Sequence, residues 1–368
     1  MAEMGTKLQK QYKPKKRRGV FGLAVFVVVI LLMVACSFFS YMYVVDSHKN
    51  ENKDVAVNVD PQTGIPVDIP MDSSTSAIAN ILQENGIIRY PLVFKIMSKV
   101  NGYDGMYKSG THIVSKDLDY DKIMRVLISN PVSIRVTIPE GFTYKQISDT
   151  LAQRNLIDKD KFNNITNSGK FDFKFLKNIP QRGNRLEGYL FPDTYEFDVK
   201  AGEKEIANRM LERFDQMFKP EYYDKAKKLN MTPDQIIILA SIIEKEAKLA
   251  DERKIIAGVF YNRLNNKDKA MRRLQSCATI QYIFLNKEGV VKQKITDNDT
   301  KINDPYNTYQ IVGLPPGTIC SPGQASIEAA LNPEKTDYLY FVAKGDGSHY
   351  FSKTLQEHLA AVKKYETN

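Results

Sequence analysis

The chain has 368 residues, of which 43% are hydrophobic and 26% are charged, and its formal net charge at pH 7 is +9. This apolar content excludes an intrinsically disordered protein, and the length is sufficient for two or three domains that each have a core. Most of the excess positive charge lies before residue 20, so the rest of the chain has no basic stripe that would predict nucleic-acid binding.

The first 45 residues contain a basic tail and a long apolar segment. Residues 1–19 hold seven Lys and Arg side chains against one acid, and the 26 residues 20–45 carry no charge. Such a segment can cross a bilayer, and the basic tail places the N-terminus in the cytoplasm. A cleaved signal peptide is the alternative, because the sequence before Cys36 faintly resembles a lipoprotein cleavage site. The apolar run continues nine residues past Cys36, so we predict a retained single-pass anchor in the cell membrane, with the remaining chain outside the cytoplasm.

Two segments follow the anchor. Residues 46–64 are mostly polar and predict a flexible stalk. Residues 65–137 alternate between strand patterns of period two and helical patterns that start at Ser, Thr or Asp capping residues. We therefore predict a small α+β module over residues 65–137.

Residues 138–368 are rich in helical patterns. The clearest helices are predicted over residues 144–154, 201–217, 232–248 and 325–332. Between them lie loops dense in Gly, Pro, Asn and Tyr, such as residues 185–197 and 306–323. Because long loops inside a compact domain are usually functional, we predict a mostly helical domain whose loops form a site. The fold class as a whole is α+β.

The helix predicted over residues 232–248 is apolar but contains two glutamates. Glu246 has only apolar residues three or four positions away, Leu249 among them, whereas Glu244 has Lys248 at i+4. We therefore expect Glu244 at the surface and Glu246 in an apolar setting that raises its pKa. A carboxyl that keeps its proton near neutral pH can act as a general acid. The alternative is that the last turns of the helix simply emerge into solvent.

A glutamate with a raised pKa beside aromatic-rich loops is consistent with an enzyme that cleaves carbohydrate. Ordinary glycosidases need a second carboxylate. Glu187, Asp193 and Glu196 lie in an eligible loop, although each is equally well explained as a turn residue. If a hydroxyl of the substrate were the nucleophile, one protein carboxyl would suffice, first as acid and then as base.

The cysteines and histidines do not form a metal-binding pattern. The sequence has no CxxC or HxxxH motif, so we predict neither a metal nor a cofactor. Cys36 lies in the apolar span, which leaves Cys277 and Cys320 in the compartment where disulfides persist. We predict that these two residues pair.

Several long motifs occur in an order that resembles the endolytic murein transglycosylase family (MltG, also called YceG-like). They are LEGYLFPDTYEF, LASIIEKEAKLADERKIIAGVFYNRL, LQSCATIQY, YNTYQIVGLPPGTICSPGQASIEAALNP and YLYFVAKGDGSHYFSKTLQEH. The resemblance implies a LysM-like module at residues 65–137 and an extracytoplasmic catalytic domain at residues 138–368. It also implies cleavage of the β-1,4 bond between N-acetylmuramic acid and N-acetylglucosamine within nascent glycan strands. The muramic acid C6 hydroxyl would attack, leaving a 1,6-anhydro end and limiting strand length.

The same resemblance assigns residues to roles. The family's catalytic glutamate, the second in its E-K-E motif, is Glu246 here. The loop residues that the resemblance implies for the sugar groove are Glu187, Gln275, Ser276, Asn307, Thr308 and Tyr309. The chain departs from many relatives in having Cys277 and Ala278 in place of Asp-Pro, and in having a cysteine at position 320. Both cysteines differ together, as a crosslink between their loops would require. His349 lies in a Gly/Ser turn, where a turn-stabilising role is expected and contact with substrate is the alternative.

The implied partners are peptidoglycan glycan strands, the membrane through one helix, and peptidoglycan synthases. An alternative of another class is a non-catalytic wall-binding scaffold that recruits the synthesis machinery. A peptidase is disfavoured, because the sequence offers neither a nucleophile with its base nor a zinc site.

Overall fold

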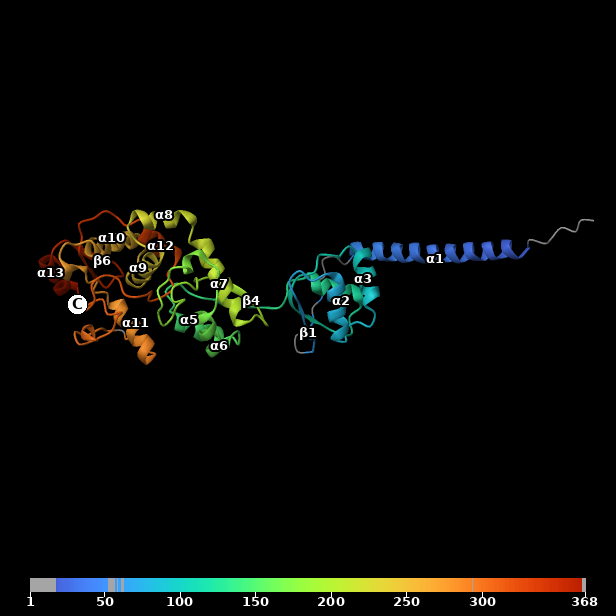
Figure 1. Ribbon diagram of the computed structural model, residues 1–368, viewed down its shortest axis with the longest axis horizontal. Coiled ribbons are helices and arrows are strands. Elements are labelled where there is room, and N and C mark those ends of the chain that lie inside the picture. Colours follow the sequence, from blue (N-terminus) through green and yellow to red (C-terminus); the bar gives the residue numbers. More distant parts are fainter. Residues whose placement is uncertain (1–17, 52–56, 58, 61–62, 293, 366–368) are drawn as a thin grey trace, which may run out of the picture. The chain divides into compact units, whose positions relative to one another are not determined.

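The computed structural model describes residues 18–51, 57, 59–60, 63–292 and 294–365 of the chain, and these form two compact units, Met1–Pro131 and Val132–Asn368. Figure 1 shows the elements of each unit in sequence colours. The mixture of helices with three two-stranded antiparallel sheets in the described residues confirms the mixed α and β class.

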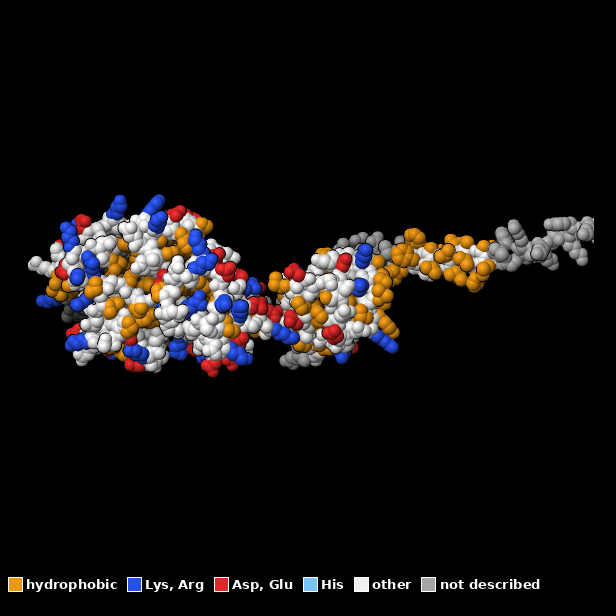
Figure 2. Space-filling model, viewed as in Figure 1, with side chains coloured by type: hydrophobic (Ala, Val, Ile, Leu, Met, Phe, Trp, Pro, Cys, Tyr) orange, Lys and Arg blue, Asp and Glu red, His pale blue; other side chains and the backbone are white. Residues whose placement is uncertain are grey.

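A single long helix, α1 (Arg18–Glu51), precedes the rest of the first unit. Its stretch Gly22–Tyr41 has 20 residues and a mean hydropathy of 2.9, so it is long and apolar enough to cross a membrane. Figure 2 shows the side chains of this stretch as mostly hydrophobic. The helix continues into the segment predicted as a stalk, whereas residues 1–17 of the predicted tail and residues 52–56 of the stalk lie outside the described residues.

The remainder of the first unit runs strand, helix, helix, strand, helix. The elements are β1 (Ile65–Ile69), α2 (Thr75–Glu84), α3 (Pro91–Val100), β2 (Gly110–Val114) and α4 (Tyr120–Ile128). The strands β1 and β2 are antiparallel, with Val67 opposite His112. Ser74 and Asp119 cap α2 and α4 through their side-chain oxygens, as the sequence pattern indicates. Apolar side chains from all five elements bury one small core.

The strand β3 (Ser133–Thr137) belongs to the second unit. It pairs in antiparallel register with β4 (Thr194–Asp198), which lies almost sixty residues later, so that Val136 faces Tyr195 across the ladder. Both side chains are buried in the core of the second unit. The boundary between the units therefore lies after Pro131, and the module predicted over residues 65–137 is shorter by one strand.

The second unit is mostly helical. Its helices are α5 (Tyr144–Gln153), α6 (Lys159–Ser168), α7 (Glu203–Met217), α8 (Pro220–Lys228), α9 (Pro233–Glu246), α10 (Arg253–Leu264), α11 (Cys277–Glu288), α12 (Gln324–Leu331) and α13 (Leu355–Tyr365). A hairpin of β5 (Tyr340–Ala343) and β6 (His349–Ser352) precedes α13. Four short 3-10 helices lie in the connections: Lys174–Leu176, Ala250–Glu252, Lys269–Arg272 and Asp299–Lys301. The four helices predicted from periodicity are all present, with ends shifted by one or two residues.

The central element of this unit is α9, whose side chains are buried on every face from Ile236 to Ile243. Thr232 and Gln235 begin it with a reciprocal capping box. Ser241 is the polar exception in the buried stretch. Its hydroxyl donates to the Ile238 carbonyl at 2.7 Å and accepts the Ile319 N–H at 3.0 Å, so no buried polar atom of Ser241 is left without a partner.

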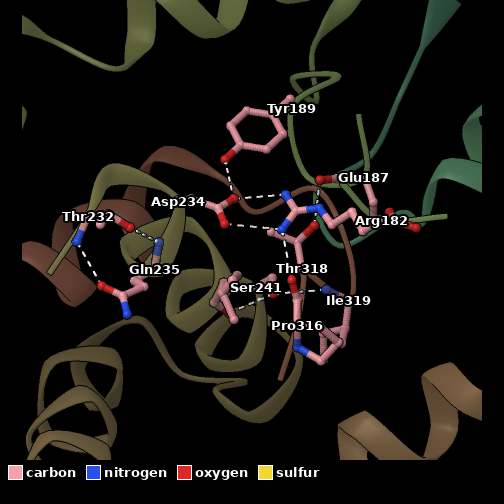
Figure 3. A network of polar contacts seen from close by, with 11 residues as sticks. Arg182, Glu187, Tyr189, Thr232, Asp234, Gln235, Ser241, Pro316, Thr318 and Ile319 are labelled. Carbon is pink, nitrogen blue, oxygen red and sulfur yellow. Dashed lines mark hydrogen bonds and ion pairs between the residues drawn. The ribbon is translucent and has the colours of Figure 1, made fainter. Parts of the chain in front are cut away.

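A buried ion pair fixes the N-terminal end of α9 (Figure 3). The Arg182 guanidinium donates to both carboxylate oxygens of Asp234, at 2.8 and 3.2 Å, and to the Pro316 carbonyl at 3.1 Å. The Tyr189 hydroxyl donates to the same carboxylate at 2.6 Å. A side chain at Gly317 would collide with this arrangement, since a Cβ there would lie 2.9 Å from Arg182 Cδ. The turn at residues 313–317 is thereby tied to the start of α9.

We predict that Asp234→Asn destabilises the protein by about 3 to 5 kcal/mol, because it leaves the Arg182 charge buried without a counter-charge. Urea unfolding of the detergent-solubilised protein measures the effect. Asp337→Asn is the matched control, since its pair with Lys353 is exposed and its loss should change the free energy of unfolding by less than about 1 kcal/mol. Equal effects of the two variants would contradict the role given to the buried pair.

Candidate active site

A cavity of about 490 Å³ opens at the C-terminal end of α9. Its walls come from α10, the start of α11, the β5–β6 hairpin and α13. The residues that line it are Glu246, Val259, Arg263, Leu274, Gln275, Cys277, Tyr309, Leu339, Tyr340, Phe341, Val342, Ala343, His349, Leu355, His358 and Val362. Glu246 is the single carboxylic acid among these described lining residues.

Glu246 is the last residue of α9 and meets the first turn of α11. Its carboxylate accepts one hydrogen bond from the Ser276 hydroxyl and another from the Ala278 N–H. Burial raises the pKa of Glu246, whereas these two donors and the nearby His349 lower it, and the net shift is upward. The site therefore holds a carboxyl that keeps its proton to a higher pH than an exposed glutamate does.

The predicted surroundings of Glu246 were partly wrong. The helix ends at Glu246, because Ala247 adopts an extended conformation with ψ 111°. Leu249 is consequently 44% exposed and is no helical neighbour of Glu246. The apolar setting comes instead from the burial of Glu246 between α9, α11 and the cavity wall.

Glu244 also differs from its prediction as a surface residue paired with Lys248. It is half-buried, and its carboxylate accepts the Gly323 N–H at 3.1 Å, at the start of α12. It lies close enough to Glu140 to raise the pKa of that carboxyl, to which burial contributes more. Glu244 does not line the active-site cavity, so the two acids of the E-K-E motif are separated as the helical pattern indicated.

The residues predicted for the sugar groove divide into two groups. Gln275 and Tyr309 line the cavity. Ser276 is buried against Glu246, and Thr308 is fully buried, where its hydroxyl accepts the Ser276 N–H at 3.0 Å and its carbonyl accepts the Gln275 N–H at 3.1 Å. Asn307 is fully buried as well, and its amide donates to two backbone carbonyls of its own loop, at 2.7 and 3.0 Å. Asn307 and Thr308 therefore shape the loop.

Glu187, which was predicted for the sugar groove, is not among the residues that line this cavity. It is 1% exposed, and its carboxylate accepts the Tyr144 N–H at 2.7 Å and the Tyr282 hydroxyl at 3.2 Å. Burial raises the pKa of Glu187 to about 7 despite these donors. The other two loop acids are also outside the cavity: Asp193 pairs with Arg213 at 2.6 Å, and Glu196 is exposed on β4.

Sequence reasoning missed Arg263 as a site residue. Arg263 is 5% exposed and donates to the Arg273 and Leu339 carbonyls and to the Gln275 side chain. The signal available was a second arginine in α10, after its mostly apolar run Ile255–Tyr261.

His349 lines the cavity, a position that suits the alternative of substrate contact. Its Nδ1 lies 2.6 Å from a carboxylate oxygen of Glu252, which accepts the His349 backbone N–H with its other oxygen at 2.9 Å. The sequence positions of Glu252 and His349 do not predict this pairing.

The predicted disulfide is absent, because Cys277 and Cys320 are free thiols. Cys320 is fully buried against α9, where its thiol donates to the Ser241 carbonyl at 3.3 Å. Cys277 is exposed at the cavity, with its sulfur 3.0 Å from the Tyr309 hydroxyl. Each sulfur therefore has a partner other than the second cysteine. Within the described part of the chain, no three His, Cys, Asp or Glu side chains are grouped as metal ligands would be.

Comparison with known proteins gives a consistent set of relatives. The model of the YceG-like family matches residues 67–364. The endolytic murein transglycosylase of Bacillus subtilis is 36% identical over 325 residues, covering 84% of this chain and 87% of the relative. That of Streptococcus pneumoniae strain D39 is 32% identical over 362 residues, and the match covers 90% of this chain and 63% of the relative. A crystal structure of a yceG-like protein from Listeria monocytogenes is 35% identical, with a TM-score of 0.53, covering 81% of this chain and 99% of that one.

We predict that the buried Glu187 makes the protein less stable as pH rises. The folded protein keeps this proton up to about pH 7, whereas the unfolded chain releases it near pH 4.3. The free energy of unfolding therefore falls between those values, by about 3 kcal/mol for this one group. Glu187→Gln removes this contribution to the pH dependence. Between pH 5 and pH 8, urea unfolding should therefore show the free energy of unfolding of the wild type falling by about 3 kcal/mol more than that of the variant.

Glu196→Gln serves as the control for this measurement, because Glu196 is exposed. Its unfolding free energy should follow the wild type at both pH values. If the unfolding free energy of Glu187→Gln changed with pH as that of the wild type does, the Glu187 carboxyl would have the same pKa in the folded protein and in the unfolded chain, which contradicts the prediction.

Proposed function

The chain belongs to the YceG-like family and is a murein transglycosylase, and on this premise we propose that it cuts glycan strands internally at the β-1,4 bond between N-acetylmuramic acid and N-acetylglucosamine. The products are a new N-acetylglucosamine end and a 1,6-anhydro-muramic acid end, so that cleavage limits the length of nascent strands. The observation that carries the proposal is Glu246, an acid of raised pKa that is the single carboxyl among the described cavity-lining residues.

The reaction needs one group that first gives and then takes a proton. Protonated Glu246 donates to the glycosidic oxygen as the bond from that oxygen to muramic acid C1 breaks. The carboxylate so formed is stabilised by the Ser276 hydroxyl and the Ala278 N–H. It then accepts the proton of the C6 hydroxyl as O6 bonds to C1. No water is consumed, and Glu246 ends protonated as it began.

Polar groups beside Glu246 suit a sugar substrate. The Gln275 amide and the Tyr309 hydroxyl are in place to hydrogen-bond hydroxyl or acetamido groups, and tyrosine rings can pack against pyranose rings. Arg263 holds the Gln275 side chain, and Glu252 holds the His349 ring. The side chains that face the substrate are therefore fixed by partners behind them, as catalysis by positioning requires.

The placement of the enzyme in the cell is part of the proposal. The anchor α1 would hold the protein in the cell membrane with its N-terminus cytoplasmic and its catalytic unit outside. The module that begins at β1 would be LysM-like and hold glycan, and peptidoglycan synthases would be partners. A non-catalytic wall-binding scaffold is the other candidate, but such a scaffold has no need of a carboxyl with a raised pKa in a cavity.

We predict that Glu246→Gln lowers cleavage by about 10³-fold or more, because the amide can neither donate nor accept the proton. Mass spectrometry of uncrosslinked glycan strands after incubation would show internal fragments with 1,6-anhydro ends for the wild type only. Glu244→Gln is the matched control on the same helix and should leave most of the activity. An inactive Glu244→Gln variant together with an active Glu246→Gln variant would refute the assignment of the acid. Fragments with reducing ends in place of 1,6-anhydro ends would indicate a hydrolase with a second carboxylate.

We also predict that removing residues 1–45 releases a soluble protein that cleaves isolated strands at an unchanged rate. None of the described side chains of Gly22–Tyr41 is buried, so the deletion takes nothing from a core. The measurement is the same fragment analysis at equal protein concentration. Loss of activity in the released protein would mean that the anchor does more than tether.

A further inference from the structure

A second cavity in the catalytic unit, of about 430 Å³, is not used by the mechanism above. It lies among α5, α6, α11 and the loop that contains Tyr306. Three tyrosines and three asparagines contribute to its wall: Tyr144, Asn163, Asn184, Tyr282, Asn286 and Tyr306. The buried Glu187 contacts two of these residues: it accepts the Tyr144 backbone N–H and the Tyr282 hydroxyl, and the second bond holds the Tyr282 ring.

One helix and one loop connect this second cavity to the active site. Cys277, the first residue of α11, lines the active-site cavity, whereas Tyr282 and Asn286 of the same helix line the second. At 1.5 Å per residue, these positions lie about 7 and 13 Å further along the helix. Tyr306 and Tyr309, three residues apart in the same loop, likewise each line one cavity. Figure 1 shows α11 on the side of the unit where α5 and α6 lie.

The charges at the second cavity argue against an anionic ligand. Lys145 and Lys159 both contribute to its wall, and both bind the Asp149 carboxylate, the former at 3.3 Å. Their positive charge is therefore already shared with an acid. What remains available is uncharged: tyrosine rings and asparagine amides.

Aromatic faces combined with amides suit an N-acetylated sugar. The Tyr282 and Tyr306 rings lie 4.9 Å apart at their centroids, and the half-buried Tyr306 contributes an aromatic ring to the cavity wall. Asn286 is exposed on α11 and Asn184 is half-exposed opposite it, so their amides can reach acetamido and hydroxyl groups. A cavity of this size and composition resembles a small-ligand site with a few polar groups that fix orientation.

We propose that this second cavity is a distal glycan-binding subsite, which holds an N-acetylated sugar of the same strand whose scissile bond lies at Glu246. The inference rests on the proposed function for the identity of the strand. Binding energy from a sugar remote from the reacting bond can be used to orient the bond at the acid. A strand must then extend from the cut site along α11, so the subsite favours bonds inside a long strand over bonds in short fragments.

Binding to the catalytically inactive Glu246→Gln protein tests the subsite without relying on cleavage. Adding Asn184→Ala and Asn286→Ala should weaken its affinity for purified uncrosslinked glycan strands about tenfold, as the loss of two hydrogen bonds would. Asn164→Ala with Asn298→Ala is the control, since both side chains are exposed and neither lines the cavity. Unchanged affinity of the Asn184/Asn286 variant, or equal weakening by the control pair, would overturn the proposal.

Cleavage supplies the second measurement. In the active protein, Asn184→Ala with Asn286→Ala should lower the ratio of kcat/KM for long strands to that for a MurNAc-GlcNAc disaccharide about tenfold, because the disaccharide is too short to gain from a remote site. If kcat/KM fell equally for the long and the short substrate, or for neither, the proposed subsite would be refuted. If the wild type cleaved no strand while the inactive protein still bound strands through these asparagines, the proposed reaction would fail and the binding site would stand.

Discussion

The catalytic unit depends on the contact between the end of α9 and the start of α11. Glu246 terminates one helix, and its carboxylate accepts the Ser276 hydroxyl and the Ala278 N–H at the beginning of the other. These donors stabilise negative charge, as the N-terminus of a helix generally does. For the contact to form, α9 must be held at a fixed position along its axis. The buried pair of Arg182 and Asp234 does so at its other end.

Burial by itself does not make a carboxyl catalytic. Glu187 is buried and Glu246 is half-buried in the same unit, and desolvation raises the pKa of both carboxyls. Glu187 accepts from Tyr144 and Tyr282 and is closed off from the active-site cavity, whereas Glu246 opens into it. Glu187 therefore joins three segments of the fold, whereas Glu246 is accessible to a substrate. Access to a cavity distinguishes their roles, since the same desolvation raises both pKa values.

The arrangement of the two cavities suits a polymeric substrate. Both lie along α11, and the loop with Tyr306 and Tyr309 contributes to both walls. Buried polar contacts of Asn307 and Thr308 hold that loop rigid between them. Asn307 and Thr308, which the family resemblance assigned to the groove, therefore lie in the loop between the two cavities and keep their spacing constant.

The sequence by itself determined the features that local patterns encode. Periodicity located the helices, an uncharged run located α1, and the helical face separated Glu246 from Glu244. Its motifs identified the family. Tertiary structure alone decided that α9 ends at Glu246, that β3 pairs with β4, that Cys277 and Cys320 stay apart, and that His349 joins Glu252. Hydrophobic spacing reports on neighbours within about four residues, whereas Glu246 and Ser276 are 30 residues apart and Glu252 and His349 are 97 apart. Contacts over such separations follow from how the whole core packs.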